Sequence, residues 1–140
     1  MRFSGKVYKD DKFWLVEVPM LDVMTQGRTR NEALAMVEDL LESLVARPGF
    51  SVTTRCKNED LEVSSSDPHA LICLFLRRQR ERSGLTLSEV AEKLGAKSRN
   101  AYARYEQGTS MPSLDKLTEL YQAVAPGQDL VLHQSTLTQR

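Results

Sequence analysis

The side chains with the most distinctive hydrogen-bonding capacity lie in one short segment, where a helix is expected over residues 98–106. Its outer side is expected to present cations, an amide and one small residue: Lys97, Arg99, Asn100, Ala103 and Arg104. An amide can pair with adenine through two hydrogen bonds, and cations suit guanine edges or phosphates. Tyr102 and Tyr105 share the opposite side of the helix. The pattern indicates a helix that enters a DNA major groove; the alternative is a solvated basic face in any small all-α domain.

A preceding helix and a tight turn are expected to position these side chains. That helix begins at Thr86, which stands three residues before Glu89 in the arrangement of a capping box. Gly95 ends it, because glycine readily adopts the left-handed conformation found after helices. Thr86 and Ser88, at the polar start of this helix, join the candidate DNA contacts.

Three stretches around this pair resemble the helix-turn-helix domain of the Xre and Cro/cI repressor family. They are GLTLSEVAEKLG from Gly84 to Gly95, RYEQG from Arg104 to Gly108, and the downstream MPSLDKL. Leu87 stands where many members of that family have a glutamine. The resemblance covers about Leu71 to Val124, and it implies a dimer that binds operator double-stranded DNA.

Two further helices are expected to flank the pair. The first runs from Leu71 and is apolar before it becomes basic. Its basic end either contacts phosphate or is solvated and ion-paired, and it comprises Arg77, Arg78, Arg80 and Arg82. The last helix starts at Pro112 and Ser113. Its apolar face, which should close the core of the domain, comprises Leu114, Leu117, Tyr121 and Val124.

The segment DLVLH, Asp129 to His133, has the composition of a short strand. A strand at the end of a chain needs an edge to pair with, and its counterpart in a second subunit offers one. We therefore expect a homodimer or a higher homo-oligomer. The alternative for this segment is a frayed tail.

The first half of the chain shows the alternation of a small sheet. Strands are expected at Arg2 to Tyr8, Phe13 to Val18, Leu21 to Gly27 and Phe50 to Cys56. A helix opening at Thr29 should cover one face of the sheet and leave Glu38, Asp39 and Glu42 outward. The fold class is therefore α+β, a small antiparallel sheet with one helix in the order β-β-β-α-β, followed by an all-α helix-turn-helix domain.

A second resemblance lies in this half. TQG at Thr25 to Gly27 and EAL at Glu32 to Leu34, after an aromatic strand that ends in a proline, resemble the N-terminal domain of HicB antitoxins over about Arg2 to Cys56. The resemblance implies a partial ribonuclease-H-like fold, a HicA-like ribonuclease toxin as partner and repression of the family's own operon.

The distribution of charge agrees with a division into two surfaces. The net charge is zero, yet residues 71–108 hold eight Lys/Arg against four Asp/Glu, and residues 1–70 hold nine against twelve. An acidic surface speeds the encounter with a cationic partner. The candidate toxin contacts are Asp10, Asp11, Phe13, Trp14, Glu17 and Asp22.

Composition predicts the division of the chain into domains. Residues 1–57 form the HicB-like domain, residues 70–126 the helix-turn-helix domain, and residues 127–140 a C-terminal strand and tail. Residues 58–69 are expected to be a linker, because this stretch is polar, has three consecutive serines and contains a proline. The alternative within it is a short strand at Leu61 to Val63.

Several functions find no support in the sequence. Cys56 and Cys73 have no metal-ligand spacing, and the acids of the first half do not converge on one site, so we expect no metal, no cofactor and no enzyme. His69 and His133 have no nucleophile beside them. No apolar run of about 18 residues and no signal-peptide core is found, which indicates a cytoplasmic protein that does not enter a membrane.

The leading hypothesis from the sequence is an antitoxin of a type II toxin-antitoxin system. It would neutralise a HicA-like mRNA-cleaving toxin through its first domain and repress its own operon through its second. The alternative is a plain helix-turn-helix transcription regulator whose α+β domain senses a small molecule or forms oligomers. An RNA-processing enzyme, the third possibility, needs a metal site that the sequence does not show.

Overall fold

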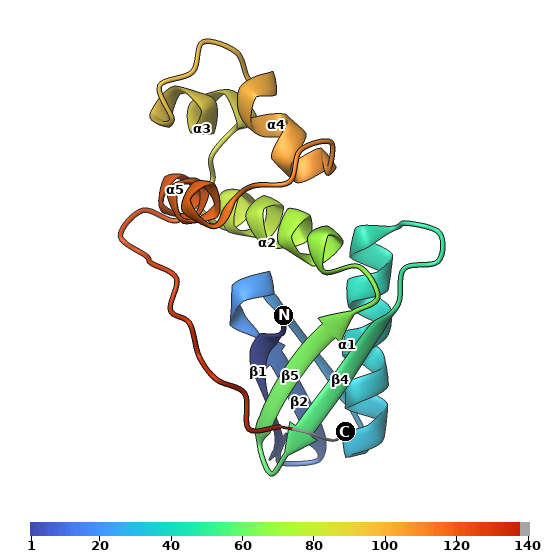
Figure 1. The fold of residues 1–140 in the computed structure, drawn as a ribbon. Coiled ribbons are helices and arrows are strands. Elements are labelled where there is room, and N and C mark those ends of the chain that lie inside the picture. Colours follow the sequence, from blue (N-terminus) through green and yellow to red (C-terminus); the bar gives the residue numbers. More distant parts are fainter. Residues whose placement is uncertain (138–140) are drawn as a thin grey trace. The chain divides into compact units, whose positions relative to one another are not determined.

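A computed structural model describes residues 1–137, which fold as two compact units (Figure 1). Among these residues, the first unit comprises 1–71 and 134–137, and the second comprises 72–133. The chain therefore leaves the first unit within one helix and re-enters it near its C-terminus. The predicted α+β class is confirmed.

The first unit is built on one antiparallel sheet with the strand order β3-β2-β1-β5-β4. A 3-10 helix, Pro19–Leu21, separates the second strand from the third. The strands are β1 (Phe3–Asp10), β2 (Phe13–Val18), β3 (Val23–Gly27), β4 (Val52–Lys57) and β5 (Asp60–Ser65).

One face of this sheet forms the core of the unit. The strand register places alternate apolar residues of three strands on that face, namely Phe3, Val7, Val16, Val18, Leu61 and Val63, and all are buried. Helix α1 (Arg30–Val45) covers them with its own buried stripe of Ala33, Leu34, Val37 and Leu41. Thr29 begins the helix as predicted, since its hydroxyl accepts a hydrogen bond from the Glu32 amide at 3.1 Å.

The start of α1 lies directly on the end of β3. A Cβ atom built on Gly27 would come within 2.5 Å of the Ala33 backbone nitrogen, so no residue larger than glycine fits without a shift. The TQG and EAL sequences, which carry the resemblance to HicB, therefore meet in space through Gly27 and Ala33.

The predicted linker is wrong over most of its length. Residues 60–65 form β5, which lies inside the sheet and pairs with both β1 and β4. Asn58, with a φ of 56°, makes the tight turn from β4. The stretch reads as polar because every second residue of β5 lies on the face away from α1, while Leu61 and Val63 are buried. The short strand that was the alternative is the correct interpretation.

Two smaller expectations for this unit also change. The third strand starts at Val23, because Asp22 follows the 3-10 helix with a left-handed φ of 51°. Glu38 does not face outward. Its carboxylate accepts hydrogen bonds from the amide and the hydroxyl of the buried Thr54, at 3.0 and 2.8 Å, and so it binds α1 to the edge strand β4.

The second unit is helical. Its elements are the later part of α2 (Pro68–Arg82) followed by α3 (Leu87–Lys93), α4 (Asn100–Gln107) and α5 (Leu114–Val124). The core includes Val90, Tyr102, Leu120 and Val124, none of which is exposed to solvent. The ring of Phe75 packs on that of Tyr121 with their centroids 5.0 Å apart.

The start of α5 corrects one expected core residue. Ser113 is the N-cap, and its hydroxyl accepts a hydrogen bond from the Lys116 amide. Leu114, the next residue, is 76% exposed, whereas Leu117 and Tyr121 are buried as predicted. Leu114 therefore begins the helix without entering the core.

The C-terminal segment differs from the expected strand. Within the described part of the chain, Asp129–His133 form no strand, and Val131 and Leu132 are 85% and 98% exposed. A strand needs a partner for its backbone groups, and this segment has no such partner within the single chain that the structure describes. Of the tail predicted over residues 127–140, residues 138–140 lie outside the described part.

Candidate nucleic-acid interface

Helix α3 begins and ends as its sequence dictates. The Thr86 hydroxyl accepts a hydrogen bond from the Glu89 amide at 3.1 Å, and the Glu89 carboxylate accepts one from the Thr86 amide at 3.0 Å. The bond from the Thr86 amide lowers the pKa of the Glu89 carboxyl. At the other end Gly95 has a φ of 76°, and the Ala96 amide reaches back to the Ala91 carbonyl at 2.9 Å, which completes a Schellman motif.

Helix α4 starts two residues later than predicted. Arg99 already has helical dihedral angles, and the Ser98 hydroxyl accepts a hydrogen bond from the Asn100 amide at 3.2 Å. Gly108, with a φ of 83°, ends the helix. The short turn between α3 and α4 is therefore determined by hydrogen bonds local to the sequence.

The packed side of α4 is wider than the sequence suggests. Tyr102 and Tyr105 are buried as predicted, and Ala103 is also buried, at 2% exposure. These three positions span an arc of about 160° at 100° per residue. Ala103 is therefore a core residue, and its assignment as a DNA contact is wrong.

The exposed side of α4 carries a stripe of polar residues. Asn100, Arg104 and Gln107 are exposed at positions i, i+4 and i+7, which lie one above another on a helix. We call these three residues the outer stripe of α4. Gln107 is not among the predicted DNA contacts, although its seven-residue spacing from Asn100 indicates that the two share one side of the helix.

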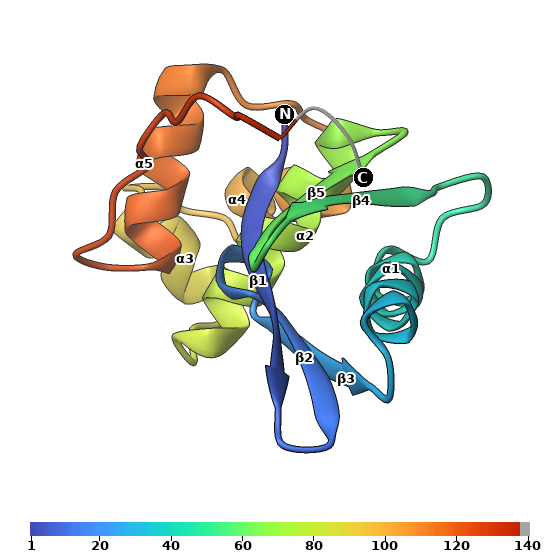
Figure 2. The ribbon, with the colours of Figure 1, turned by 90° about the horizontal axis from the view of Figure 1, so that it is seen from below.

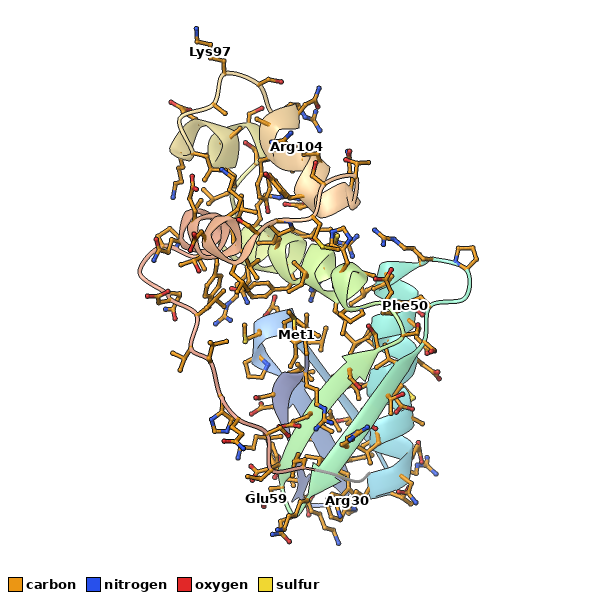
Figure 3. The ribbon with its side chains drawn as sticks, in the orientation of Figure 1. Met1, Arg30, Phe50, Glu59, Lys97 and Arg104 are labelled. Carbon is orange, nitrogen blue, oxygen red and sulfur yellow. The ribbon has the colours of Figure 1, made fainter. Side chains whose placement is uncertain are left out.

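The turn before α4 adds two exposed cations. Lys97 extends outward from the connection between α3 and α4 (Figure 3), and Arg99 is also exposed. In α3, Ser88 is exposed, but the Thr86 hydroxyl is engaged by the Glu89 amide. Of the residues predicted to contact DNA, Lys97, Arg99, Asn100 and Arg104 therefore lie on or next to one exposed helix side.

The guanidinium of Arg104 is held by the neighbouring tyrosine. Its central carbon lies 5.0 Å from the centroid of the Tyr105 ring, and Nη2 donates a 3.4 Å hydrogen bond to the Tyr105 hydroxyl. A cation above an aromatic ring is stabilised by the electrons of that ring. Arg104 is thus restricted in its orientation before any ligand binds.

A buried ion pair fixes α4 to α2, the helix that precedes α3 and α4. Arg80 Nε and Nη2 donate to the two oxygens of Glu106 at 2.7 and 3.0 Å, and Arg80 Nη1 donates to the Leu85 carbonyl at 2.9 Å. The hydrogen bonds to Glu106 raise the pKa of Arg80. Arg77 pairs with Glu81 at 3.5 Å. Of the four arginines of α2, Arg80 therefore has a structural role and is not oriented toward a phosphate.

The candidate toxin contacts do not form one cluster. Asp10, Asp11 and Phe13 gather at the tip of the β1–β2 hairpin, where Asp11 has a φ of 55° and Phe13 is 41% exposed. Trp14 is half-buried on the face covered by α1. Glu17 lies near the far end of β2, roughly 13 Å along the strand from Phe13. Asp22 lies beyond the end of that strand.

His, Cys, Asp and Glu are the side chains that bind metal ions most often in proteins. Over residues 1–137, no group of three or more His, Cys, Asp or Glu side chains could hold a metal ion. The two cysteines are free thiols, Cys73 buried and Cys56 half-buried. Within the same residues, no helix has both the length and the apolar character needed to cross a membrane.

Comparison with known families agrees with this geometry. Residues 76–123, from the middle of α2 to the last turn of α5, match the helix-turn-helix family. They form a helix-turn-helix domain of the Xre/Cro type. The match supports a DNA-binding transcription regulator that recognises double-stranded DNA, with α4 in the position of the recognition helix. No curated protein matches the chain significantly.

The match does not extend to residues 1–75. The resemblance of the first unit to HicB antitoxins therefore stays a prediction, as does the toxin partner.

Proposed function

We propose that this protein is an antitoxin that represses its own operon. Its helix-turn-helix domain binds operator DNA, and its first unit binds a HicA-like ribonuclease and blocks it. The chain itself is not an enzyme in this proposal, and it acts in the cytoplasm. The outer stripe of α4, with Lys97 and Arg99 beside it, is the observation that best supports the DNA-binding half.

In the DNA complex, the outer stripe lies in the major groove. Asn100 is suited to pair with adenine, and Arg104 with guanine or the adjacent phosphate. Lys97 and Arg99, which are exposed at the turn, reach the phosphate backbone. Asn100 and Arg104 come from a helix whose position is fixed by the Arg80–Glu106 pair.

The operator complex contains two copies of the chain. Asp129–His133, which expose Val131 and Leu132, pair with the same segment of a second copy and thereby gain backbone partners. Two recognition helices then reach half-sites about 34 Å apart, or a multiple of that distance.

The toxin binds at the tip of the β1–β2 hairpin. Asp10 and Asp11 are exposed there, next to the exposed aromatic ring of Phe13. An exposed aromatic side chain beside carboxylates suits a cationic partner, since the charges speed the encounter and the ring supplies contact area. Glu17 and Asp22, at the other end of β2, belong to this surface only if the toxin spans the whole strand.

The experiment measures inhibition of the ribonuclease encoded beside the gene. We expect the purified chain to silence RNA cleavage, and we expect the double variant Asp10→Asn/Asp11→Asn and the variant Phe13→Ala to require more protein for the same inhibition. Asp39→Asn, an exposed acid on α1 of the same unit, is the matched control and should inhibit like the natural chain.

One observation favours a second function. The family match is confined to the helix-turn-helix domain, which is the pattern expected for a plain transcription regulator with an α+β sensing or oligomerisation domain. Operator binding with no effect on any neighbouring ribonuclease supports that function and rejects the antitoxin.

A further inference from the structure

The sheet of the first unit has an open face, on the side away from α1. The register places Lys6, Tyr8, Leu15 and Glu62 there, because their neighbours along each strand point into the core. Tyr8 and Leu15 are half-buried. Lys6 pairs with Asp60 at 2.5 Å across the neighbouring strands β1 and β5.

The C-terminal segment of the chain lies on this open face. Arg2 Nη1 donates hydrogen bonds to Glu62 Oε1 at 3.0 Å, to the Ser135 hydroxyl at 3.0 Å and to the Leu137 carbonyl at 2.6 Å. The Ser135 hydroxyl donates to Glu62 Oε1 at 2.5 Å and accepts a bond from the Leu137 amide at 3.1 Å. Figure 2 shows α1 on one side of the sheet and this segment on the other.

The contact has the features of a specific docking site. The Glu62 side chain is 11% exposed and Leu137 is 6% exposed, so a polar anchor and an apolar anchor are both withdrawn from water. A carboxylate and a guanidinium that share the same hydroxyl form charge-assisted hydrogen bonds, which are stronger than neutral ones.

We propose that Ser135–Leu137 is a releasable strap that occupies the open face of the sheet. The occupant is the C-terminal segment of the same chain, held by Arg2 and Glu62. The strap is releasable because it is short, because Gln134 and Thr136 are exposed, and because Leu137 is its one buried side chain among the described residues. Such segments open locally without unfolding the element on which they lie.

The strap controls access to the sheet. A partner that needs the surface around Arg2 and Glu62 must first displace Ser135–Leu137. A toxin that binds the first unit would have to do so if it spans this face, a consequence that rests on the proposed function. The docking itself does not depend on that function and is tested on the chain alone.

The test is amide hydrogen exchange of the full-length protein, followed by mass spectrometry on peptides that cover residues 134–137. We expect protection of this segment in the natural chain. Ser135→Ala and Glu62→Gln should each speed its exchange about tenfold, as expected for the loss of a hydrogen bond to a charged group. Ser135→Ala lies outside the sheet, so it keeps the test valid if Glu62→Gln fails to fold.

Two matched control variants distinguish loss of docking from a nonspecific effect of substitution in the strap or in the sheet. Thr136→Ala changes an exposed residue of the strap, and Asp60→Asn removes the Lys6 ion pair between the same two strands. Both should leave the exchange of the strap unchanged. The proposal is overturned if the natural segment already exchanges like unstructured chain, or if Ser135→Ala has no effect. Protection that rises with protein concentration would also overturn it, by assigning the strap to a second copy.

Discussion

Arg80 and Glu106 face each other through two hydrogen bonds of 2.7 and 3.0 Å, with side chains that are only 16% and 7% exposed. The pair joins α2 to the last turn of α4, and the bond from Arg80 to the Leu85 carbonyl adds the loop before α3. The orientation of the recognition helix thus depends on one arginine, whose hydrogen bonds given above all go to partners within the domain.

Breaking this pair should destabilise the helical unit. Glu106→Gln leaves the Arg80 guanidinium largely buried without its countercharge, so we expect a loss of about 3 kcal/mol in the free energy of unfolding. Urea unfolding followed by helical circular dichroism measures it. The control is Arg77→Gln, whose pair with Glu81 is exposed and should contribute less than about 1 kcal/mol. Equal stability of the two variants would contradict this role for Glu106.

Asn100 and Lys97 should affect operator binding in different ways. Asn100→Ala should cost about 1–3 kcal/mol at the cognate base and relax the preference there, because an amide reads a base edge. Lys97→Ala should weaken binding equally on all sequences and reduce the salt dependence by about one charge. Fluorescence anisotropy on operator and scrambled DNA at several salt concentrations distinguishes them. A uniform loss with Asn100→Ala would assign Asn100 to the backbone.

The capping box of α3 should be sensitive to acid. The Thr86 amide lowers the pKa of Glu89 below its ordinary value of 4.5, so the stabilisation is complete above that value and is lost as the pH falls through the lower, folded value. An NMR titration of the Glu89 carboxyl checks the direction of the shift. Glu89→Gln should remove this part of the pH dependence of helix content; an unshifted titration would show that the box does not form in solution.

The contact between β3 and α1 should not tolerate a larger residue. Gly27→Ala places a methyl group 2.5 Å from the Ala33 nitrogen, which should cost at least about 1–3 kcal/mol. Trp14, the single tryptophan, lies opposite Gly27 in the sheet and reports unfolding of the first unit by fluorescence. Gln26→Ala, at the exposed neighbour, is the control. A fully stable Gly27→Ala variant would mean that α1 does not pack against β3 in this way.

Features determined by nearby residues could be predicted from the sequence. Thr86, Gly95 and Ser113 begin or end helices through hydrogen bonds and dihedral angles within a few positions. Helical spacing is equally local. It predicts that Tyr102 and Tyr105 form the packed side of α4, and it therefore also predicts four of the exposed candidate contacts.

Features that depend on distant partners could not be predicted in this way. β5 is polar at every second position. Its place beside β1 depends on pairing between residues that are 60 positions apart in the sequence, as between Phe3 and Val63. Alanine occurs on both the buried and the exposed sides of helices. Ala103 is buried because of how the other helices of the domain pack against α4. In the sequence, Arg80 does not differ from its basic neighbours in α2, because its partner Glu106 lies 26 residues away.

The most direct test of the proposed function is to recover the tagged protein from its native cells and identify the retained partner by mass. We expect a small basic protein whose ribonuclease activity is silenced when the two are mixed. Operator binding that is intact, with no such ribonuclease retained, would contradict the antitoxin function and leave a plain transcription regulator.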